Sequence, residues 1–221
     1  MANSMNKDMI YWRALRDVYL KQRGTGELYQ PNSRIAPGLI VFFYNLFPHP
    51  YFNMGLETFK NKYIANENEI EHLGDNGEHT KVELKGMSEM YKYIEHYEFE
   101  EEFTIFELME LHRKLFSHSP FPENAGKFRE TQAIITGNGV EPSLPENLIS
   151  DFFALSDEFD TITKMPINTN EDITNYIKSS VILTTKLIKI HPFVDGNGRS
   201  IRGLLNLMFK KANIPPVYVV P

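Results

Sequence analysis

The residues best suited to chemistry lie together in the stretch HPFVDGNGRSIR, from His191 to Arg202. The ordinary pKa of a histidine side chain allows general-base work near neutral pH. Gly196, Asn197 and Gly198 come where a new helix is expected to open, and the first amides and positive dipole end of a helix favour bound anions. Glycines let a phosphate approach that backbone closely. The stretch therefore predicts a site for a phosphate-containing substrate.

Three charged residues of the same stretch could complete this site. Asp195 is an oxygen ligand suited to Mg²⁺, which usually takes one or two carboxylates together with substrate phosphates. Arg199 and Arg202 stand three positions apart, so we expect both guanidinium groups on one helix face, opposite the apolar stripe. There they could bind further phosphate oxygens. Two cations beside a helix start indicate a polyphosphate.

Each of these residues also has a purely structural interpretation. A histidine before proline more often ends a helix, paired arginines more often form a solvated face, and an aspartate is common in turns. Their joint occurrence in one short stretch favours the functional interpretation. A calcium loop is excluded because Asn206 stands where its last carboxylate is required, and no GxxxxGK[ST] motif occurs. We interpret His112, on an apolar helix face, as a core histidine.

Two long helices are expected to position the stretch. The run from Asp172 to Ile190 is apolar on nearly all sides, which predicts a helix buried in the middle of a bundle. It should end before Pro192, because proline disfavours helical geometry in the preceding residue. A second helix is predicted from about Gly198 and should close at Asn213. Its apolar residues at helical spacing are Ile201, Leu204, Leu205, Met208, Phe209 and Ala212.

Upstream segments add two helices and one β element. Residues 81–97 have a helical apolar pattern. Thr104 and Glu107 have the spacing of a capping box, and an apolar stripe through Leu108, His112 and Leu115 follows them. The run QAIITGNGVEP predicts a short β-hairpin with a Gly-Asn-Gly turn. The predicted fold class is mainly α, a helical bundle with one short hairpin.

Composition limits the remaining possibilities. The chain has 221 residues, of which 42% are hydrophobic and 24% charged, enough for one core domain over residues 61–221 preceded by a helical or irregular arm over residues 1–60. A net charge of −6 with interspersed signs makes nucleic acid an unlikely partner. There is no cysteine. No signal peptide or membrane span is evident, so we expect no membrane association and a cytoplasmic protein.

The stretch HPFVDGNGRSIR resembles the signature HPFx[DE]GNGRxxR of the Fic (Fido-fold) family, with every fixed position present. The likeness extends to LHRKLF from Leu111 and GKFRETQAII from Gly126, and covers roughly residues 60–221. It implies a protein adenylyltransferase that moves AMP from Mg-ATP to a Ser, Thr or Tyr hydroxyl of a target protein. Self-modification and a homo-oligomer are left open.

The resemblance also implies a role for each residue of the site. His191 would deprotonate the acceptor hydroxyl and Asp195 would bind Mg²⁺. The nucleotide would be held by Phe193, Gly196, Asn197, Gly198, Arg199 and Arg202. The hairpin resembles the family's flap, which lays a target segment beside the site by strand pairing. Its docking residues would be Gln132, Ala133, Ile134, Ile135 and Thr136.

Many family members carry an inhibitory helix with the pattern [ST]xxxE[GN]. The segment YIANENEIEHL resembles it imperfectly, and we hypothesise that Glu71, with Glu67 as the second choice, pairs with Arg202 and restrains activity. Two alternatives to adenylylation stay open from the sequence. One is transfer of another phosphate-containing group, UMP or phosphocholine. The other is a nucleotide-binding regulatory module without turnover.

Overall fold

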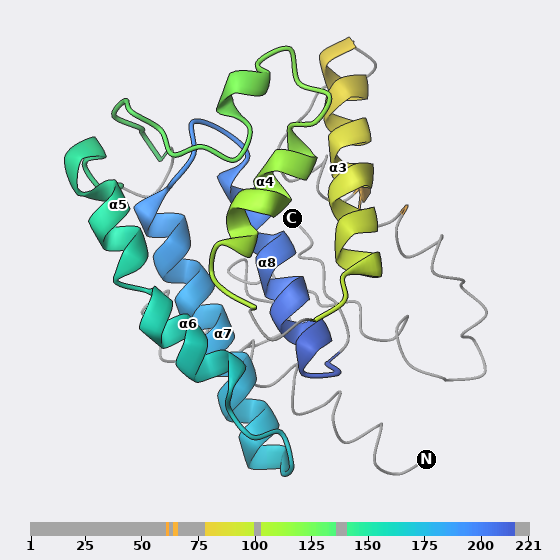
Figure 1. The fold of residues 1–221 in the computed structure, drawn as a ribbon, viewed down its shortest axis with the longest axis vertical. Helices are drawn as coiled ribbons and strands as arrows, with labels where there is room; N and C mark the ends of the chain where they lie inside the picture. Colours follow the sequence, from red (N-terminus) through yellow and green to blue (C-terminus); the bar gives the residue numbers. More distant parts are fainter. Residues whose placement is uncertain (1–60, 62–63, 66–77, 100–102, 136–140, 215–221) are drawn as a thin grey trace, which may run out of the picture.

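The computed structural model describes residues 61, 64–65, 78–99, 103–135 and 141–214 (Figure 1). The division expected at residue 60 stays untested, because residues 1–60 lie outside this part. The described part is mainly helical, as predicted, and contains no strand. Its helical elements are α3 (Glu78–His96), α4 (Glu107–Leu115), the 3-10 turn η2 (Pro122–Asn124), α5 (Pro145–Phe153), α6 (Ser156–Thr163), α7 (Asn170–Ile190) and α8 (Asn197–Lys211).

Helix α8 is the centre of the bundle and packs against α3, α4 and α7 (Figure 1). Five of its six predicted apolar residues are buried, while Ala212, just past the helix end, is partly buried. Polar residues on its other faces are buried as well, including Ser200 and Asn206. The expectation that the preceding helix occupies the middle is wrong. Helix α7 buries one face only, because serines, threonines and lysines alternate with its apolar residues, and even Ile182 is 41% exposed. The buried Tyr176 hydroxyl donates to the Met208 carbonyl at 2.6 Å and ties the two helices together.

Helix α7 has well-defined ends. At its start, Thr169 and Asp172 form a capping box, in which the Asp172 N–H donates to the threonine hydroxyl (3.1 Å) and the Thr169 N–H donates to the carboxylate (2.8 Å). At its end the last helical residue is Ile190, as Pro192 predicts. The helix is thus fixed at both ends, and the residue that follows it is His191.

Helices α3 and α4 confirm the two predicted upstream helices and cover α8 from one side. They approach so closely that a Cβ atom on Gly86 would lie 1.8 Å from the Leu115 carbonyl oxygen. At the far end of α3, Lys210 of α8 donates to three backbone carbonyls within 2.9 Å and closes the helix C-terminus. These carbonyls belong to Ile94, Glu95 and Tyr97.

The capping box expected at Thr104 does not form. Helix α4 begins at Glu107 without a side-chain cap, and the Thr104 carbonyl accepts from the Glu107 N–H at 3.1 Å in a backbone turn. The Glu107 carboxylate instead accepts a 2.6 Å hydrogen bond from the Tyr93 hydroxyl of α3. The capping box needed the Glu107 carboxylate, which is bound instead by Tyr93 of another helix.

The expected hairpin is not seen as β-structure in the described residues. Residues 132–135 are irregular, the turn at 136–140 lies outside the description, and the chain from 141 leads directly into α5. Ile134 is 83% exposed, so its side chain does not pack against the core. A lone two-stranded hairpin is only marginally stable in water, which explains why the local pattern alone does not impose strands. Helices α5 and α6, which we did not predict, follow this segment.

Within the described residues, no helix is both long enough and apolar enough to cross a bilayer.

Candidate functional site

The site is built on the tight turn that joins α7 to α8. His191 adopts a left-handed conformation (φ 54°), which ends α7 and redirects the chain. The Asn197 side chain then closes the turn: its oxygen accepts from the Phe193 N–H and its nitrogen donates to the Phe193 carbonyl, both at 2.8 Å. Asn197 is buried. Its side chain therefore shapes the turn, so the nucleotide-binding role that the resemblance implied for Asn197 would fall to its backbone amide and stays a prediction.

Gly196 allows α8 to begin where it does. The residue has φ 72°, and a Cβ atom there would lie 2.6 Å from the Phe116 ring. The first amide bonded back into the helix is that of Ser200, which donates to the Gly196 carbonyl at 3.0 Å. The amides of Asn197 and Gly198 thus come before the first bonded turn, as at any helix start. They lie where the sequence predicted an anion-binding element, and that binding stays a prediction.

His191, at the start of the turn, is half-buried. Burial lowers the pKa of its imidazole, the cationic Arg129 lowers the pKa further, and the Ile188 backbone and the Asp195 carboxylate oppose the shift. Nδ1 is buried, so we expect Nε2 to be the nitrogen that meets an external group. A neutral imidazole is suited to accept a proton.

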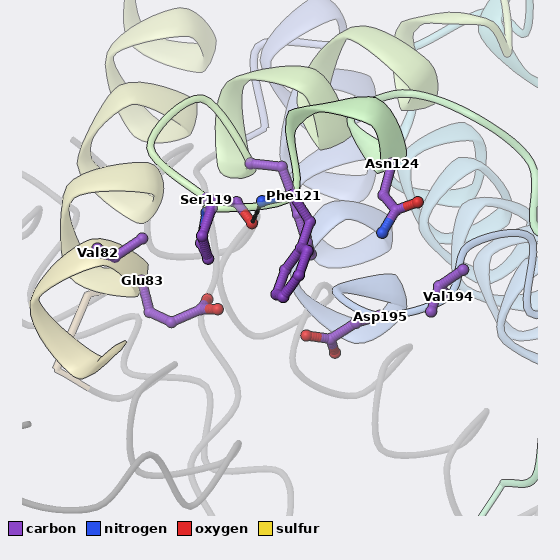
Figure 2. A pocket seen from close by; sticks show the side chains of 9 residues that line it. Val82, Glu83, Ser119, Phe121, Asn124, Val194 and Asp195 are labelled. Atoms are coloured by element: carbon purple, nitrogen blue, oxygen red, sulfur yellow. Dashed lines mark hydrogen bonds between the residues drawn. The ribbon is translucent and has the colours of Figure 1, made fainter. Parts of the chain in front are cut away.

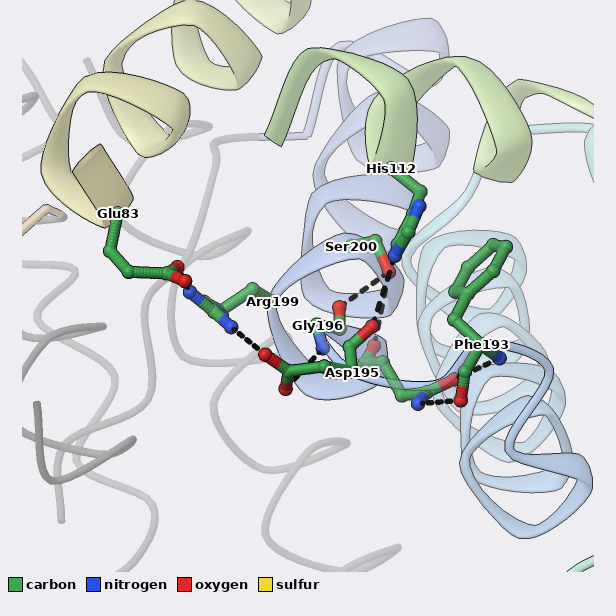
Figure 3. A network of polar contacts seen from close by, with 8 residues as sticks. Glu83, His112, Phe193, Asp195, Gly196, Arg199 and Ser200 are labelled. Carbon is green, nitrogen blue, oxygen red and sulfur yellow. Dashed lines mark hydrogen bonds and ion pairs between the residues drawn. The ribbon is translucent and has the colours of Figure 1, made fainter. Parts of the chain in front are cut away.

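Asp195 is joined to a buried ion-pair network (Figure 3). Its carboxylate accepts from the Gly196 N–H at 2.6 Å and from the Arg199 guanidinium at 3.4 Å. Arg199 also pairs with Glu83 of α3, which sequence analysis did not single out. The side chain of Asp195 is 60% exposed, whereas that of Arg199 is 2% exposed. The expected exposed pair of arginines is therefore wrong for Arg199, because a carboxylate from α3 draws its guanidinium into the bundle. Arg202 is half-buried.

His112 links the turn to the loop after α4. Its Nε2 lies 3.0 Å from the Asp195 carbonyl oxygen, and its Nδ1 accepts from the Gly126 N–H at 2.9 Å. Its ring stacks between Phe116 and Phe193, with ring centroids 4.4 and 3.8 Å away. Burial lowers the pKa of His112 to about 4, so the ring is neutral. The prediction of a core histidine is confirmed. Phe193, expected to touch nucleotide, is instead fully buried in this stack.

A cavity of about 310 Å³ opens beside Asp195 (Figure 2). Its walls come from the start of α3, the loop after α4 and the α7–α8 turn. Its lining is mostly apolar, and Figure 2 shows the carboxylates of Glu83 and Asp195 both directed toward it. The lining residues are Val82, Glu83, Phe116, Ser119, Pro120, Phe121, Asn124, Val194 and Asp195.

The other predicted site residues divide into two groups. Gln132, Ala133, Ile134 and Ile135 belong to the irregular segment after Arg129, while Thr136 lies outside the described residues. Glu71 and Glu67 also lie outside, so their pairing with Arg202 stays a prediction. Within the described residues, no cluster of three or more metal-ligating side chains occurs.

Together these features define a class of protein: a helical domain whose central helix begins directly after a tight turn that carries a histidine and a carboxylate. The Fic/DOC family model matches residues 102–209 of the chain. Residues 102–209 therefore form a Fic/DOC family domain, as the signature indicated.

Named relatives agree with this assignment. Over 139 residues the chain is 33% identical to the protein adenylyltransferase Fic of Nematostella vectensis, a match that covers 62% of this chain and 30% of that protein. For the protein adenylyltransferase Fic of Drosophila willistoni the identity is 33% over 138 residues, 62% of this chain and 26% of that protein. The chain thus spans under a third of the length of these relatives.

The fold itself has solved counterparts. The structure of Fic-1 from C. elegans, determined for a variant with a glutamate-to-glycine substitution, aligns with a TM-score of 0.55 at 21% identity. The alignment covers 95% of this chain and 59% of that chain. Fic-1 without the substitution aligns with a TM-score of 0.54 at 20% identity, covering 97% of this chain and 60% of that chain. At this identity the likeness concerns the fold alone.

Proposed function

We propose that this chain is a protein adenylyltransferase, which transfers AMP from Mg-ATP to a Ser, Thr or Tyr hydroxyl of a target protein. The observation that carries the proposal is the pairing of a neutral, half-buried His191 with the first amides of α8 across a single turn. The names of the relatives, protein adenylyltransferase Fic, support the same activity. The target protein, self-modification, a homo-oligomer and a cytoplasmic location stay predictions.

In this proposal His191 is the general base. Its Nε2 accepts the proton of the acceptor hydroxyl as the oxygen forms a bond to the α-phosphorus of ATP. The bond between that phosphorus and the bridging oxygen breaks, and pyrophosphate leaves. The lowered pKa of His191 keeps the imidazole unprotonated at neutral pH, which is the form that can accept a proton.

The donor phosphates would rest on the amides of Asn197 and Gly198, whose position at the α8 start favours negative charge. Arg202 would supply a cation. Asp195 fits Mg²⁺, because a largely exposed carboxylate beside a phosphate site is the ligand that magnesium usually takes together with substrate oxygens. Magnesium bound there would neutralise phosphate charge. Arg199, held between Glu83 and Asp195, would orient that carboxylate.

Two further elements belong to the proposal. The segment Gln132 to Thr136 would lay the target chain beside His191 by strand pairing. Glu71, or otherwise Glu67, would pair with Arg202 and restrain transfer. If this restraint operates, Glu71→Gly raises the rate of ATP-dependent labelling clearly, whereas an unchanged rate for Glu71→Gly and Glu67→Gly removes it.

The donor can be identified by incubating the protein with Mg²⁺ and labelled ATP, UTP or CDP-choline, followed by electrophoresis. We expect label on protein from ATP. The variant His191→Ala should lose the label, and His96→Ala, at an exposed histidine near the end of α3, should retain it. If only UTP or only CDP-choline labels the protein, the transferred group is UMP or phosphocholine and not AMP. No label from any donor, with nucleotide still bound and Glu71 and Glu67 replaced, would identify a regulatory module instead.

A further inference from the structure

Arg129 is a buried arginine outside the HPFVDGNGRSIR stretch, and only 3% of its surface is exposed. Within the described residues it has no carboxylate partner. Its side chain donates only to backbone carbonyls, and all three guanidinium nitrogens take part. These bonds run from Nε to His191 (2.7 Å), from one terminal nitrogen to Thr131 (2.7 Å), and from the other to Ser143 (2.5 Å) and Ile190 (3.3 Å).

Two of these carbonyls lie at the end of α7, one on its last residue, Ile190, and one on the next residue, His191. The final carbonyls of a helix have no partner within it and carry the negative end of its dipole. A buried cation is therefore favourable there. The Arg129 N–H also donates to the Pro192 carbonyl at 2.9 Å. One residue thus binds the carbonyls of Ile190, His191 and Pro192, the three consecutive residues that carry the candidate base.

The hydrogen bond from Arg129 to the His191 carbonyl stabilises an unfavourable backbone conformation. A residue with a side chain adopts φ 54° at some cost in free energy, and such conformations persist only when their surroundings fix them. The Arg129 Nε–H fixes the carbonyl of this residue. Because the imidazole direction follows the backbone that carries it, Arg129 also fixes where Nε2 can point.

The remaining two hydrogen bonds join both ends of one segment. Thr131 precedes the exposed Ile134, and Ser143 follows the Gly-Asn-Gly sequence shortly before α5 begins. Figure 1 shows the green chain after η2 passing the blue connection between α7 and α8, where the Arg129 N–H donates to the Pro192 carbonyl. The Arg129 guanidinium therefore binds Thr131 and Ser143 and, at the same time, the turn between α7 and α8.

We propose that Arg129 is a positioning residue that fastens Thr131 and Ser143 to the turn carrying His191, so that whatever docks on residues 132–135 meets the histidine at a fixed place. The docking role rests on the proposed function. The fastening rests on the hydrogen bonds alone and can be tested without any enzymatic activity.

The test uses paired spin labels, which attach specifically because the chain contains no cysteine. One label is placed at Ile134→Cys in the segment and the other at Ile182→Cys, an exposed position on α7. The distance distribution between them is recorded by pulsed electron paramagnetic resonance, in the full chain and with Arg129→Lys added. Lysine keeps the positive charge but cannot form the planar fork that reaches four carbonyls. Arg113→Lys, at an exposed arginine, is the matched control.

We expect a narrow distribution in the parent and in Arg113→Lys, and one at least about twofold broader in Arg129→Lys. A narrow distribution in both parent and Arg129→Lys would overturn the proposal, and so would a parent distribution as broad as in denaturant. The parent measurement decides this second point even if Arg129→Lys does not fold. Circular dichroism checks folding, and Arg129→Gln repeats the comparison with a smaller neutral donor.

Transfer kinetics separate a positioning role from a loss of structure. With AMP transfer established, Arg129→Lys should lower kcat/KM for the acceptor about 10- to 100-fold, because misplacement by about 1 Å is enough for such a loss. The Kd for Mg-ATP should stay within about twofold of the parent, since Arg129 contacts no part of the α8 start. A broadened distance without any change in acceptor kinetics would retain the fastening and refute the docking role.

Discussion

Acidification should destabilise the folded chain through His112. Burial lowers the pKa of this histidine from about 6.5 to about 4, so the unfolded chain takes up a proton there before the folded chain does. A pKa lowered by folding contributes stability that is complete above about pH 6.5 and is lost as the pH falls toward 4. The interval of about 2.5 between the two values, at about 1.4 kcal/mol for each, corresponds to about 3 kcal/mol.

The measurement is urea unfolding followed by circular dichroism at pH values from 7 to 4, in buffer containing a chelator, for the parent and for His112→Gln. Glutamine does not titrate, and the constant effect of its different size cancels when the pH dependences are compared. Between pH 6.5 and 4 the parent should lose about 3 kcal/mol more unfolding free energy than His112→Gln. His118→Gln, at an exposed position, shows what the exchange itself contributes. Parallel curves for the parent and His112→Gln would refute the reasoning.

Three further predictions concern the packing and the base. Gly86→Ala should lower the unfolding free energy by at least about 2 kcal/mol in urea titrations, because its methyl group would lie 1.8 Å from the Leu115 carbonyl oxygen; a change below about 0.5 kcal/mol would mean that the two helices separate easily. Tyr176→Phe should cost about 1–3 kcal/mol by leaving the buried Met208 carbonyl without its 2.6 Å bond, and an unchanged thermal midpoint would contradict this. The acid limb of kcat/KM should fall below pH 6.5, because burial lowers the pKa of His191 and only the neutral imidazole accepts a proton; a limb above pH 6.5 would show that the shift is absent in solution.

The sequence correctly predicted the features of the fold that nearby residues determine. The apolar spacing after Gly198 gave the course of α8, and Pro192 gave the end of α7, because each signal acts within a few residues of where it stands. The same reasoning failed for Thr104, where Tyr93 of another helix takes Glu107, while an equally spaced pair at Thr169 forms a real capping box. Spacing alone could not distinguish these two cases.

Within the candidate site, residue types were predictable but their partners were not. Glu83 and Arg199 are 116 positions apart, and no periodicity links them before the bundle is folded. The burial of Arg199 and Phe193 follows from that long-range packing. Arg129 was visible only as part of GKFR, and its four carbonyl partners exist only once α7 and segment 131–143 have met. A signal that could have singled it out is an arginine in an otherwise short and polar loop.

The most direct test of the central claim uses ATP labelled in turn at its α- and γ-phosphates, incubated with the protein and Mg²⁺. Transfer by His191 at the start of α8 predicts protein labelled from the α-phosphate and unlabelled from the γ-phosphate, with the label lost in His191→Ala while Mg-ATP still binds. Label arriving from the γ-phosphate, or α-label undiminished in His191→Ala, would contradict the account.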